Sequence, residues 1–458
     1  MASYNPNPHP SPPPNTNPSS FFTIPHDIPS NPLFLTIEDI LTVLRLLPLL
    51  PNIFLPLPRL FTSTPLSELS PTPSNLRDVI LHTILLASQL SLLATFPIAV
   101  LTLWAVPGIA HAIFYTSFAL TTGCITWLLN IRPRTRRCLV GRPQGREAVN
   151  VSGDKRGEVW FFINGIATGT HWHQSNLTYL STLFNRQIIG IHNPTKGLLL
   201  DILECIIQRD LNYSTRAIRV GRAQLHSALS SPDTTKVVLI AHSQGGIIAG
   251  AIIDWLYGEL GDEVMGKLEV YTFASAGRIL RNPLRHPWIK RREDGVNSTA
   301  NEKRVLGHVE HYANTSDLVS NLGVLQFTSS LSASMRSACL ASWYVPQCYL
   351  DMHFDHGDGH GHEHSRPFNQ FHGPVFIHQR SGHLLNMHYL DTMFAEGSGF
   401  METMVDLDVD GGVVQRPLGD LSRLWKYKDG RSPEDYQGNE EKDDGVNVQG
   451  VAGGFEGD

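Results

Sequence analysis

The sequence is poor in charge, in cysteine and in ligand-binding motifs, and each shortage argues against a class of protein. Only 17% of its 458 residues are charged, and the formal net charge of −6 argues against a nucleic-acid binder. The five cysteines show no CxxC spacing, which argues against a disulfide framework and a zinc ribbon. Neither a GxGxxG nor a P-loop sequence occurs. We therefore expect no nucleotide and no cofactor.

Both ends of the chain lack the composition of a folded core. Residues 1–33 are rich in Pro, Asn and Ser and contain no basic stretch followed by an apolar run, so no secretory signal is expected. Residues 429–458 are rich in Gly, Asp and Glu. Segments of these compositions bury too little apolar surface to fold. We predict a disordered tail at each end, the second one acidic.

Charged residues are missing altogether between Val79 and Ile131. A membrane-spanning helix needs about 20 apolar residues. The stretch is long enough for two such helices, which we place at about 79–104 and 109–130, separated near Pro107. Uncharged runs of this length are rare in soluble domains, because helices there need a polar outer face. We predict an N-terminal membrane hairpin, with a buried helical hairpin of a soluble core as the alternative.

Arginines cluster directly after this uncharged stretch, and the turn between its two halves carries no charge. They are Arg132, Arg134, Arg136, Arg137, Arg142 and Arg146. The positive-inside rule then places the following domain in the cytosol. Two complete spans and a hairpin that returns to the same side give the same orientation, and both remain open. In either case the partner is a lipid bilayer.

The segment 34–78 is apolar but is broken by prolines, which forbid one continuous spanning helix. Within it, 37–47 is a candidate amphipathic helix. Such a helix lies on a membrane surface or forms an arm that packs on the next domain. The sequence leaves both options open.

From residue 150 to 428 short apolar runs alternate with stretches of helical length. Continuous apolar strands separated by helices indicate a parallel sheet covered on both faces. We therefore predict a doubly wound, mostly parallel α/β domain. The expected strands are 159–163, 188–191, 237–241, 268–273, 309–312 and 375–378, and the expected helices are 176–184, 198–229 and 246–260.

The sharpest local feature is LIAHSQGG at 239–246, where an apolar strand runs into a serine and then a helical pattern. A nucleophile elbow has this form, with small residues two before and two after the serine. Ala241 stands where glycine is commoner, and Gly245 takes the second position. We predict that Ser243 is the nucleophile.

A serine nucleophile needs a base and an orienting acid, which follow it along the chain in this type of fold. Asp317 follows the strand at 309–312 and is the chosen acid; Asp254 and Glu310 compete less well, because a helix and a strand would hold them. His383, in a Gly-His pair after the last strand, is the chosen base, with His388 as the alternative.

The oxyanion hole needs backbone N–H groups aimed at the developing negative charge. Gln244 follows the nucleophile and supplies one N–H. Ile166, in the INGIATG turn after the first strand, is the second candidate donor.

These motifs resemble those of the α/β-hydrolase superfamily. More narrowly, the chain is similar to lipase-like serine esterases of a largely uncharacterised, fungal-type group that carry a domain of unknown function. The matching stretches are FFINGIATGTHWHQSN (161–176), VVLIAHSQGG (237–246), HYANTSDLV (311–319) and SGHLLNMHYLD (381–391). The resemblance implies an α/β-hydrolase fold and an ester, thioester or amide hydrolase with Ser243, Asp317 and His383 as its triad. It does not imply a substrate.

We therefore expect a membrane-tethered esterase or lipase-like enzyme that acts on a small or lipid-like ester. A catalytically inert scaffold and an acyltransferase that uses the same acyl-enzyme are the alternatives. A His-rich loop at 351–366 holds five histidines between His353 and His364. Imidazole suits zinc or nickel, but the interleaved glycines fix no geometry. We expect no metal there and interpret the loop as an insertion.

Overall fold

The computed structural model describes residues 31–57, 65–131, 139–143, 157–285, 304–328, 344–345, 371–409 and 412–436. The predicted tails up to residue 30 and from residue 437, and the His-rich loop at 351–366, lie outside the described residues.

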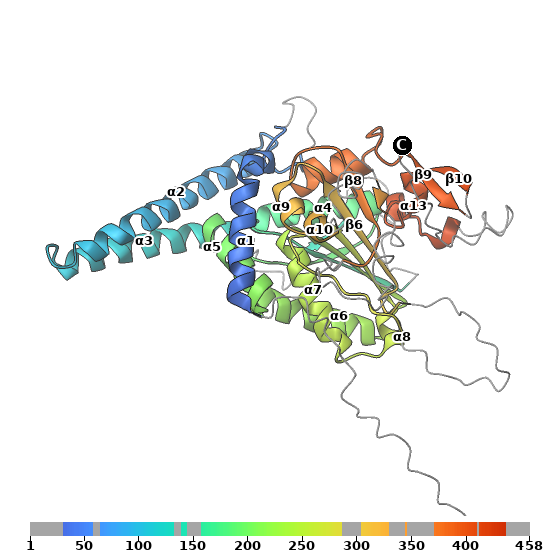
Figure 1. Cartoon of the computed structure of the whole chain (residues 1–458), viewed down its shortest axis with the longest axis horizontal. Helices are drawn as coiled ribbons and strands as arrows, with labels where there is room; N and C mark the ends of the chain where they lie inside the picture. The colour runs from blue at the N-terminus through green and yellow to red at the C-terminus, as the bar shows by residue number, and fades with distance from the viewer. Residues whose placement is uncertain are drawn as a thin grey trace, which may run out of the picture.

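A mostly parallel sheet of eight strands forms the centre of the molecule, in the order β1-β3-β2-β4-β5-β6-β8-β7 (Figure 1). The six inner strands run parallel, and β1 and β7 pair antiparallel at the two edges. The mixed α/β architecture is therefore confirmed. The strands are β1 (Leu139–Gly141), β2 (Glu158–Ile163), β3 (Ile188–Ile191), β4 (Lys236–His242), β5 (Leu268–Phe273), β6 (His308–Asn314), β7 (Tyr344–Val345) and β8 (Val375–His378), beside a separate pair β9 (Met404–Val409) and β10 (Gly412–Pro417).

Helices cover both faces of the sheet. Successive side chains of a strand point to opposite faces, and in β2 this puts Phe161 and Ile163 in one core cluster and Trp160 and Phe162 in the other. The first cluster includes residues of α6 and α7, the second residues of α4 and η3, a π-helix. The helices of the domain are α4 (Thr170–Phe184), α5 (Leu198–Leu211), α6 (Arg216–Ser230), α7 (Gln244–Tyr257), α8 (Asp262–Met265), α9 (Leu318–Leu322), α10 (Val324–Thr328), η3 (Leu385–Phe394), α13 (Leu418–Leu421) and η4 (Trp425–Gly430).

Several boundaries differ from the sequence prediction. The helix expected at 176–184 begins earlier, at Thr170. The helix expected at 198–229 is two helices, because Asn212 adopts a left-handed conformation and ends α5 before Thr215 begins α6. The sheet also starts before residue 150, since β1 pairs with β3. A strand of three residues is too short to show a periodic pattern.

The uncharged stretch forms two long helices, α2 (Pro73–Leu101) and α3 (Gly108–Leu129), which pack side by side and project from the domain (Figure 1). Both are long and apolar enough to cross a membrane, and little of either is buried within the protein. Thr72 caps α2 through the N–H of Asn75, so this helix starts six residues before Val79, where the uncharged stretch begins.

The segment before the hairpin packs on the α/β domain through α1 (Pro32–Leu46) and η1 (Leu47–Ile53). Asn31 caps α1 and Pro32 opens it, so the helix begins five residues before the predicted start. Asp39 of α1 is buried against the guanidinium groups of Arg209 and Arg278. Of the two options that the sequence left open, packing on the domain is observed.

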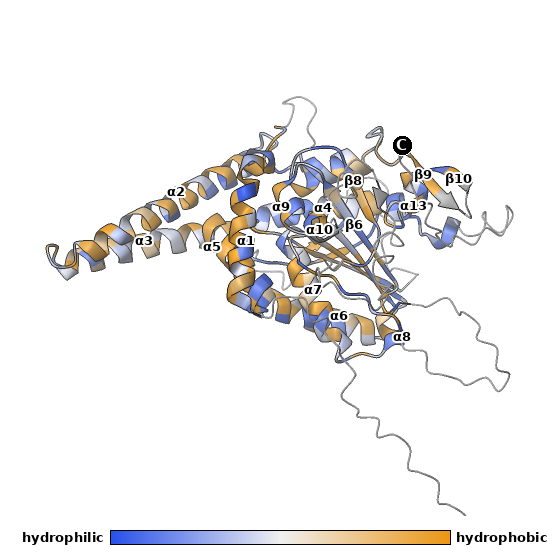
Figure 2. Ribbon diagram, in the orientation of Figure 1, coloured by the Kyte–Doolittle hydropathy of each residue, from blue (hydrophilic) through white to orange (hydrophobic). Residues whose placement is uncertain are grey.

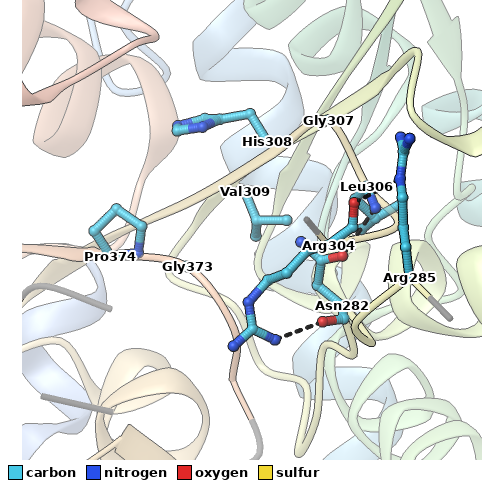
Figure 3. A pocket seen from close by; sticks show the side chains of 9 residues that line it. All are labelled: Asn282, Arg285, Arg304, Leu306, Gly307, His308, Val309, Gly373 and Pro374. Carbon is cyan, nitrogen blue, oxygen red and sulfur yellow. Dashed lines mark hydrogen bonds between the residues drawn. The ribbon is translucent and has the colours of Figure 1, made fainter. Parts of the chain in front are cut away.

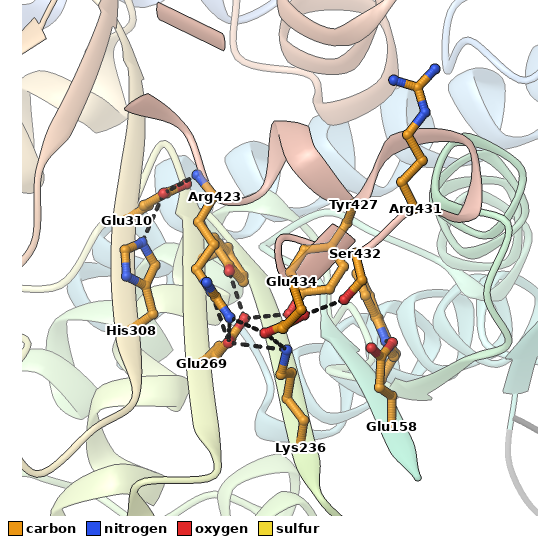
Figure 4. A network of polar contacts seen from close by, with 12 residues as sticks. Glu158, Lys236, Glu269, His308, Glu310, Arg423, Tyr427, Arg431, Ser432 and Glu434 are labelled. Atoms are coloured by element: carbon orange, nitrogen blue, oxygen red, sulfur yellow. Dashed lines mark hydrogen bonds and ion pairs between the residues drawn. The ribbon is translucent and has the colours of Figure 1, made fainter. Parts of the chain in front are cut away.

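A polar network at the start of the central strands holds the C-terminal segment in place (Figure 4). The Glu269 carboxylate accepts hydrogen bonds from Arg423 Nε (2.9 Å) and from the Tyr427 hydroxyl (2.8 Å). Glu434 forms an ion pair with Lys236 at 2.7 Å. The folded part therefore continues past residue 428, where we expected the disordered tail to begin. The residues that these contacts hold in place are polar, so no apolar pattern in the sequence predicts that they fold.

Replacing Asp39 by Ala should destabilise the protein strongly. The change removes the carboxylate that two largely buried guanidinium groups share, and breaking such a pair costs about 3–5 kcal/mol. Denaturant unfolding in detergent would measure it. Glu38→Ala is the matched control, because that carboxylate is half exposed and its ion pair with Arg278 is expected to contribute at most about 1 kcal/mol. Equal losses in the two variants would contradict this account of α1.

Candidate active site

Ser243 lies in the tight turn between β4 and α7, and its backbone is strained. Its φ of +57° and ψ of −122° belong to a region that L-residues rarely adopt. The turn is held on both sides: the Ser243 N–H donates to the Phe273 carbonyl, and the Ser243 carbonyl accepts from the Ala276 N–H. A strained strand-to-helix turn of this kind projects a serine hydroxyl beyond the end of the sheet.

Two glycines leave room for this turn. A Cβ atom on Gly245 would lie 2.5 Å from the Ile163 carbonyl oxygen of β2, so only glycine lets α7 start this close to the sheet. A Cβ atom on Gly165 would lie 2.5 Å from the Cβ of Ser243 and 2.9 Å from its Oγ. Gly165 is therefore required by close approach to the serine. Sequence reasoning missed this contact.

Ser243, His383 and Asp317 form one hydrogen-bonded relay. The distance from His383 Nε2 to Ser243 Oγ is 3.0 Å. The other ring nitrogen, Nδ1, lies 2.9 Å from Asp317 Oδ2 and 3.1 Å from Oδ1. The three residues follow the carboxyl ends of the parallel strands β4, β8 and β6, which lie on the same side of the sheet. All three are buried. The geometry is that of a nucleophile, a base and an orienting acid.

Asp317 is held as a carboxylate. Burial alone would raise the pKa of Asp317, but the neighbouring His383 and the Tyr389 hydroxyl outweigh burial and lower it. Tyr389 donates to Oδ2 at 2.7 Å, and the Val319 N–H donates to Oδ1 at 2.9 Å. Sequence reasoning assigned no role to Tyr389, which lies within the stretch SGHLLNMHYLD and 72 residues from Asp317 along the chain.

The alternative candidates lie elsewhere. His388 accepts the Leu384 N–H on Nδ1 and contacts the Pro56 carbonyl through Nε2, so both ring nitrogens bind backbone. Asp254 lies on α7 and forms an ion pair with Arg281, and Glu310 lies within β6.

His242 fixes the backbone of His383. The pKa of His242 falls to about 3, because burial disfavours its charged form and the neighbouring His383 imidazole acts in the same direction. The ring is therefore neutral at ordinary pH. Its Nε2 lies 2.8 Å from the His383 carbonyl oxygen, which can only accept, so Nε2 carries the proton.

The two predicted oxyanion donors flank Ser243. Gln244 is the first residue of α7, so its N–H has no partner within the helix. Ile166 lies in the turn that passes over Ser243 at Gly165. The next residue, Ala167, has a φ of +50° and donates its N–H to the buried carboxylate of Asp201 at 2.9 Å. Asp201 thus fixes the turn that carries Ile166.

A chain of buried amides also links the two halves of the predicted hole. Asn193 and Asn164 bond reciprocally, through Asn193 N to Asn164 Oδ1 and Asn164 Nδ2 to the Asn193 carbonyl. Asn193 Nδ2 donates to Gln244 Oε1, and Gln244 Nε2 donates to Gln208 Oε1. Sequence reasoning missed this network, because each amide by itself is indistinguishable from a turn residue.

The N-terminal segment contacts the loops that carry the acid and the base. Glu68 is buried, and its carboxylate accepts the N–H groups of Asn386 and Met387, at the start of the helix after His383. Asn52 donates to the carbonyl of Ser316, the residue before Asp317. No sequence motif before Glu158 predicted a contribution to the site.

The α2–α3 hairpin contacts the segment that directly follows the INGIATG turn of Ile166. Asn75 Oδ1, near the start of α2, lies 3.1 Å from both His171 Nε2 and Trp172 Nε1. A Cβ atom on Gly169 would lie 2.7 Å from the Leu129 carbonyl oxygen of α3. His171 and Trp172 therefore bind the base of the hairpin.

A pocket of about 380 Å³ lies at the other end of the strands (Figure 3). It surrounds the start of β6, where Arg285 donates to the Arg304 carbonyl and Arg304 to that of Asn282. It shares no residue with the Ser243 site. Within the described ranges no group of three metal-binding side chains is found.

No family model, no curated protein and no solved structure matches this chain. Its function therefore has to be inferred from its own residues and their geometry.

Replacing Gly165 by Ala should remove most of the reactivity of Ser243. The added methyl group would collide with Ser243 Cβ, and a displacement of about 1 Å at a reacting group costs on the order of 100-fold in rate. The rate of labelling by a fluorophosphonate probe measures the effect. Gly123→Ala is the control, since nothing lies within 4 Å of the added atom there. Unchanged labelling of a folded Gly165→Ala protein would refute the close approach.

Replacing Glu68 by Gln should flatten the pH dependence of stability. Burial raises the pKa of Glu68 from 4.5 to about 7. Because the folded-state value is the higher one, the contribution of Glu68 is fully present below pH 4.5 and is lost as the pH rises through 7. The wild type should lose about 3 kcal/mol relative to Glu68→Gln over that interval. Unfolding free energies of both proteins at pH 4.5 and 8 test this, and parallel pH profiles would contradict it.

Proposed function

We propose that this protein is a membrane-tethered serine hydrolase of the α/β-hydrolase type that cleaves a carboxylic ester. The observation that carries the proposal is the strained backbone of Ser243 together with its hydrogen bond to His383. Strain of this kind costs about 1–3 kcal/mol and persists where function requires it. An inert scaffold would gain nothing from it, which favours the enzyme over the scaffold.

The reaction follows from the roles that the geometry allows. His383 Nε2 takes the proton of Ser243 as Oγ attacks the ester carbonyl carbon, and Asp317 stabilises the imidazolium. The N–H groups of Gln244 and Ile166 bind the oxyanion. The intermediate collapses, and the alcohol leaves with the proton from His383. His383 then deprotonates a water molecule, which attacks the acyl carbon of the acyl-enzyme. The bond from that carbon to Ser243 Oγ breaks, His383 returns the proton to Oγ, and the carboxylic acid is released.

A lipid-like ester is the proposed substrate class. A small apolar cluster that includes Ile247, Leu318 and Val319 adjoins the relay, and this suits an apolar acyl group. The α2–α3 hairpin would hold the site close to a bilayer. The arginines after Ile131 favour a domain that faces the cytosol.

Labelling of the full-length protein in detergent with a fluorophosphonate tests the proposal. Wild type should label; Ser243→Ala should not, and Asp317→Asn should label about 10⁴-fold more slowly. Ser227→Ala, an exposed serine of α6, is the matched control and should label as wild type does.

Absence of labelling in folded wild-type protein, or labelling that survives Ser243→Ala, would refute the hydrolase. Product analysis with and without an alcohol acceptor separates hydrolysis from acyl transfer, because both pass through the same acyl-enzyme.

A further inference from the structure

Helix α1 turns its buried acidic residue Asp39 toward the protein and most of its large apolar residues outward, the reverse of a helix on a soluble domain. Asp39 is buried against Arg209 and Arg278. The opposite side carries large apolar side chains at helical spacing, and Leu33 is 67% exposed and Leu41 48%. The exposed set on α1 is Leu33, Phe34, Ile37, Ile40, Leu41 and Leu44.

The neighbouring helix α5 shows the same inversion. Its acidic residues Asp201 and Asp210 are buried, Asp201 with hydrogen bonds to the loops after β2 and β3, and Asp210 beside Arg278. Its exposed apolar residues are Leu200, Ile202, Leu203 and Leu211. Helices α1 and α5 pack against each other, so their outer sides form one surface, which we call the α1–α5 surface.

The α1–α5 surface is continuous with the hairpin. Helix α5 also packs against α2, and apolar residues extend from α1 and α5 along α2 and α3 (Figure 2). In Figure 1 α1 runs across the base of the hairpin, on the side from which the hairpin projects. A bilayer entered by the hairpin would lie across the hairpin and therefore along α1.

One occupant accounts for the whole apolar area. Soluble monomers rarely expose continuous apolar patches larger than a few hundred Å². A second protein chain would have to cover α1 and α5 and also fit beside an uncharged hairpin. A bilayer covers all four helices without any shape matching, and interfacial helices sink their apolar side about 5–10 Å into the headgroup boundary.

We propose that the α1–α5 surface is a bilayer-docking surface that holds the α/β domain flat against the lipid. The underside of this layer reaches the site: Leu46 and Leu49 pack on the cluster that contains Leu318, and Asn52 binds the Ser316 carbonyl beside Asp317. Docking thus brings the acid loop next to the lipid surface. That the substrate is an ester dissolved in this bilayer rests on the proposed hydrolase function, whereas docking itself does not.

Lipid photocrosslinking of the full chain in phosphatidylcholine nanodiscs tests this surface. Benzoylphenylalanine would replace Leu41 on α1 or Leu203 on α5. Leu93 on α2 serves as the hairpin reference, and Val413 on β10 is the matched control, an apolar residue that is 73% exposed but lies far from the surface. We expect positions 41 and 203 to capture lipid within about threefold of position 93 and at least about tenfold above position 413.

Three results would overturn the docking surface. Lipid capture at position 93 alone would mean that the hairpin enters the bilayer while the domain stands away from it. Capture of a second protein chain at 41 or 203 would make the surface a protein interface. Capture of lipid at none of the positions would contradict both the entry of the hairpin into the bilayer and the docking of the α1–α5 surface. Fluorophosphonate labelling of the same samples reports the hydrolase separately: loss of labelling with intact lipid capture would refute the enzyme and leave the docking surface standing.

Discussion

The backbone of Ser243 is the constraint around which the rest of the molecule is arranged. A residue with a side chain and a φ of +57° is unfavourable by itself, so its neighbours have to hold it there. The parallel strands β4 and β5 do this from one side through the Phe273 carbonyl. Gly165 and Gly245 do it by having no side chain, which lets the oxyanion turn and β2 close on the serine. The large core on both faces of the sheet makes this arrangement stable enough to keep the strain.

The supports of the relay reach well beyond the α/β domain. Glu68 accepts a hydrogen bond from the start of η3, the helix after His383. Asn52 binds the loop that carries Asp317. Asn75 binds Trp172 on α4, the helix that follows the Ile166 turn. All three lie in the stretch that ends with the start of the hairpin. The N-terminal segment is therefore a structural part of the site as well as the connection to helices α2 and α3. A change in its position would affect the loops of Asp317 and His383 and the helix that follows the Ile166 turn at once.

The sequence predicted those features that are encoded locally. An apolar β-branched run followed by HSQGG identifies both β4 and its turn, and the order serine, acid, histidine along the chain selected Asp317 and His383. It failed where contacts join residues far apart: Glu68 lies 318 residues from Asn386, and the stretch around His383 that contains Asn386 does not point to Glu68. The short strand β1 and the polar C-terminal segment were missed for a related reason. They fold because of what they contact, and their own patterns do not show it.

Helix α1 shows why periodicity alone cannot tell which side of a helix faces inward. The pattern at 37–47 correctly predicts a helix with one apolar side, and the usual assumption buries that side. Here Arg209 and Arg278 reverse it, since two guanidinium groups inside the domain require a carboxylate and Asp39 supplies it. Once Asp39 points inward, helical geometry sends the leucines outward. Buried charge in the domain thereby determines that an apolar surface faces the side from which the hairpin projects, and that side is where a membrane would lie.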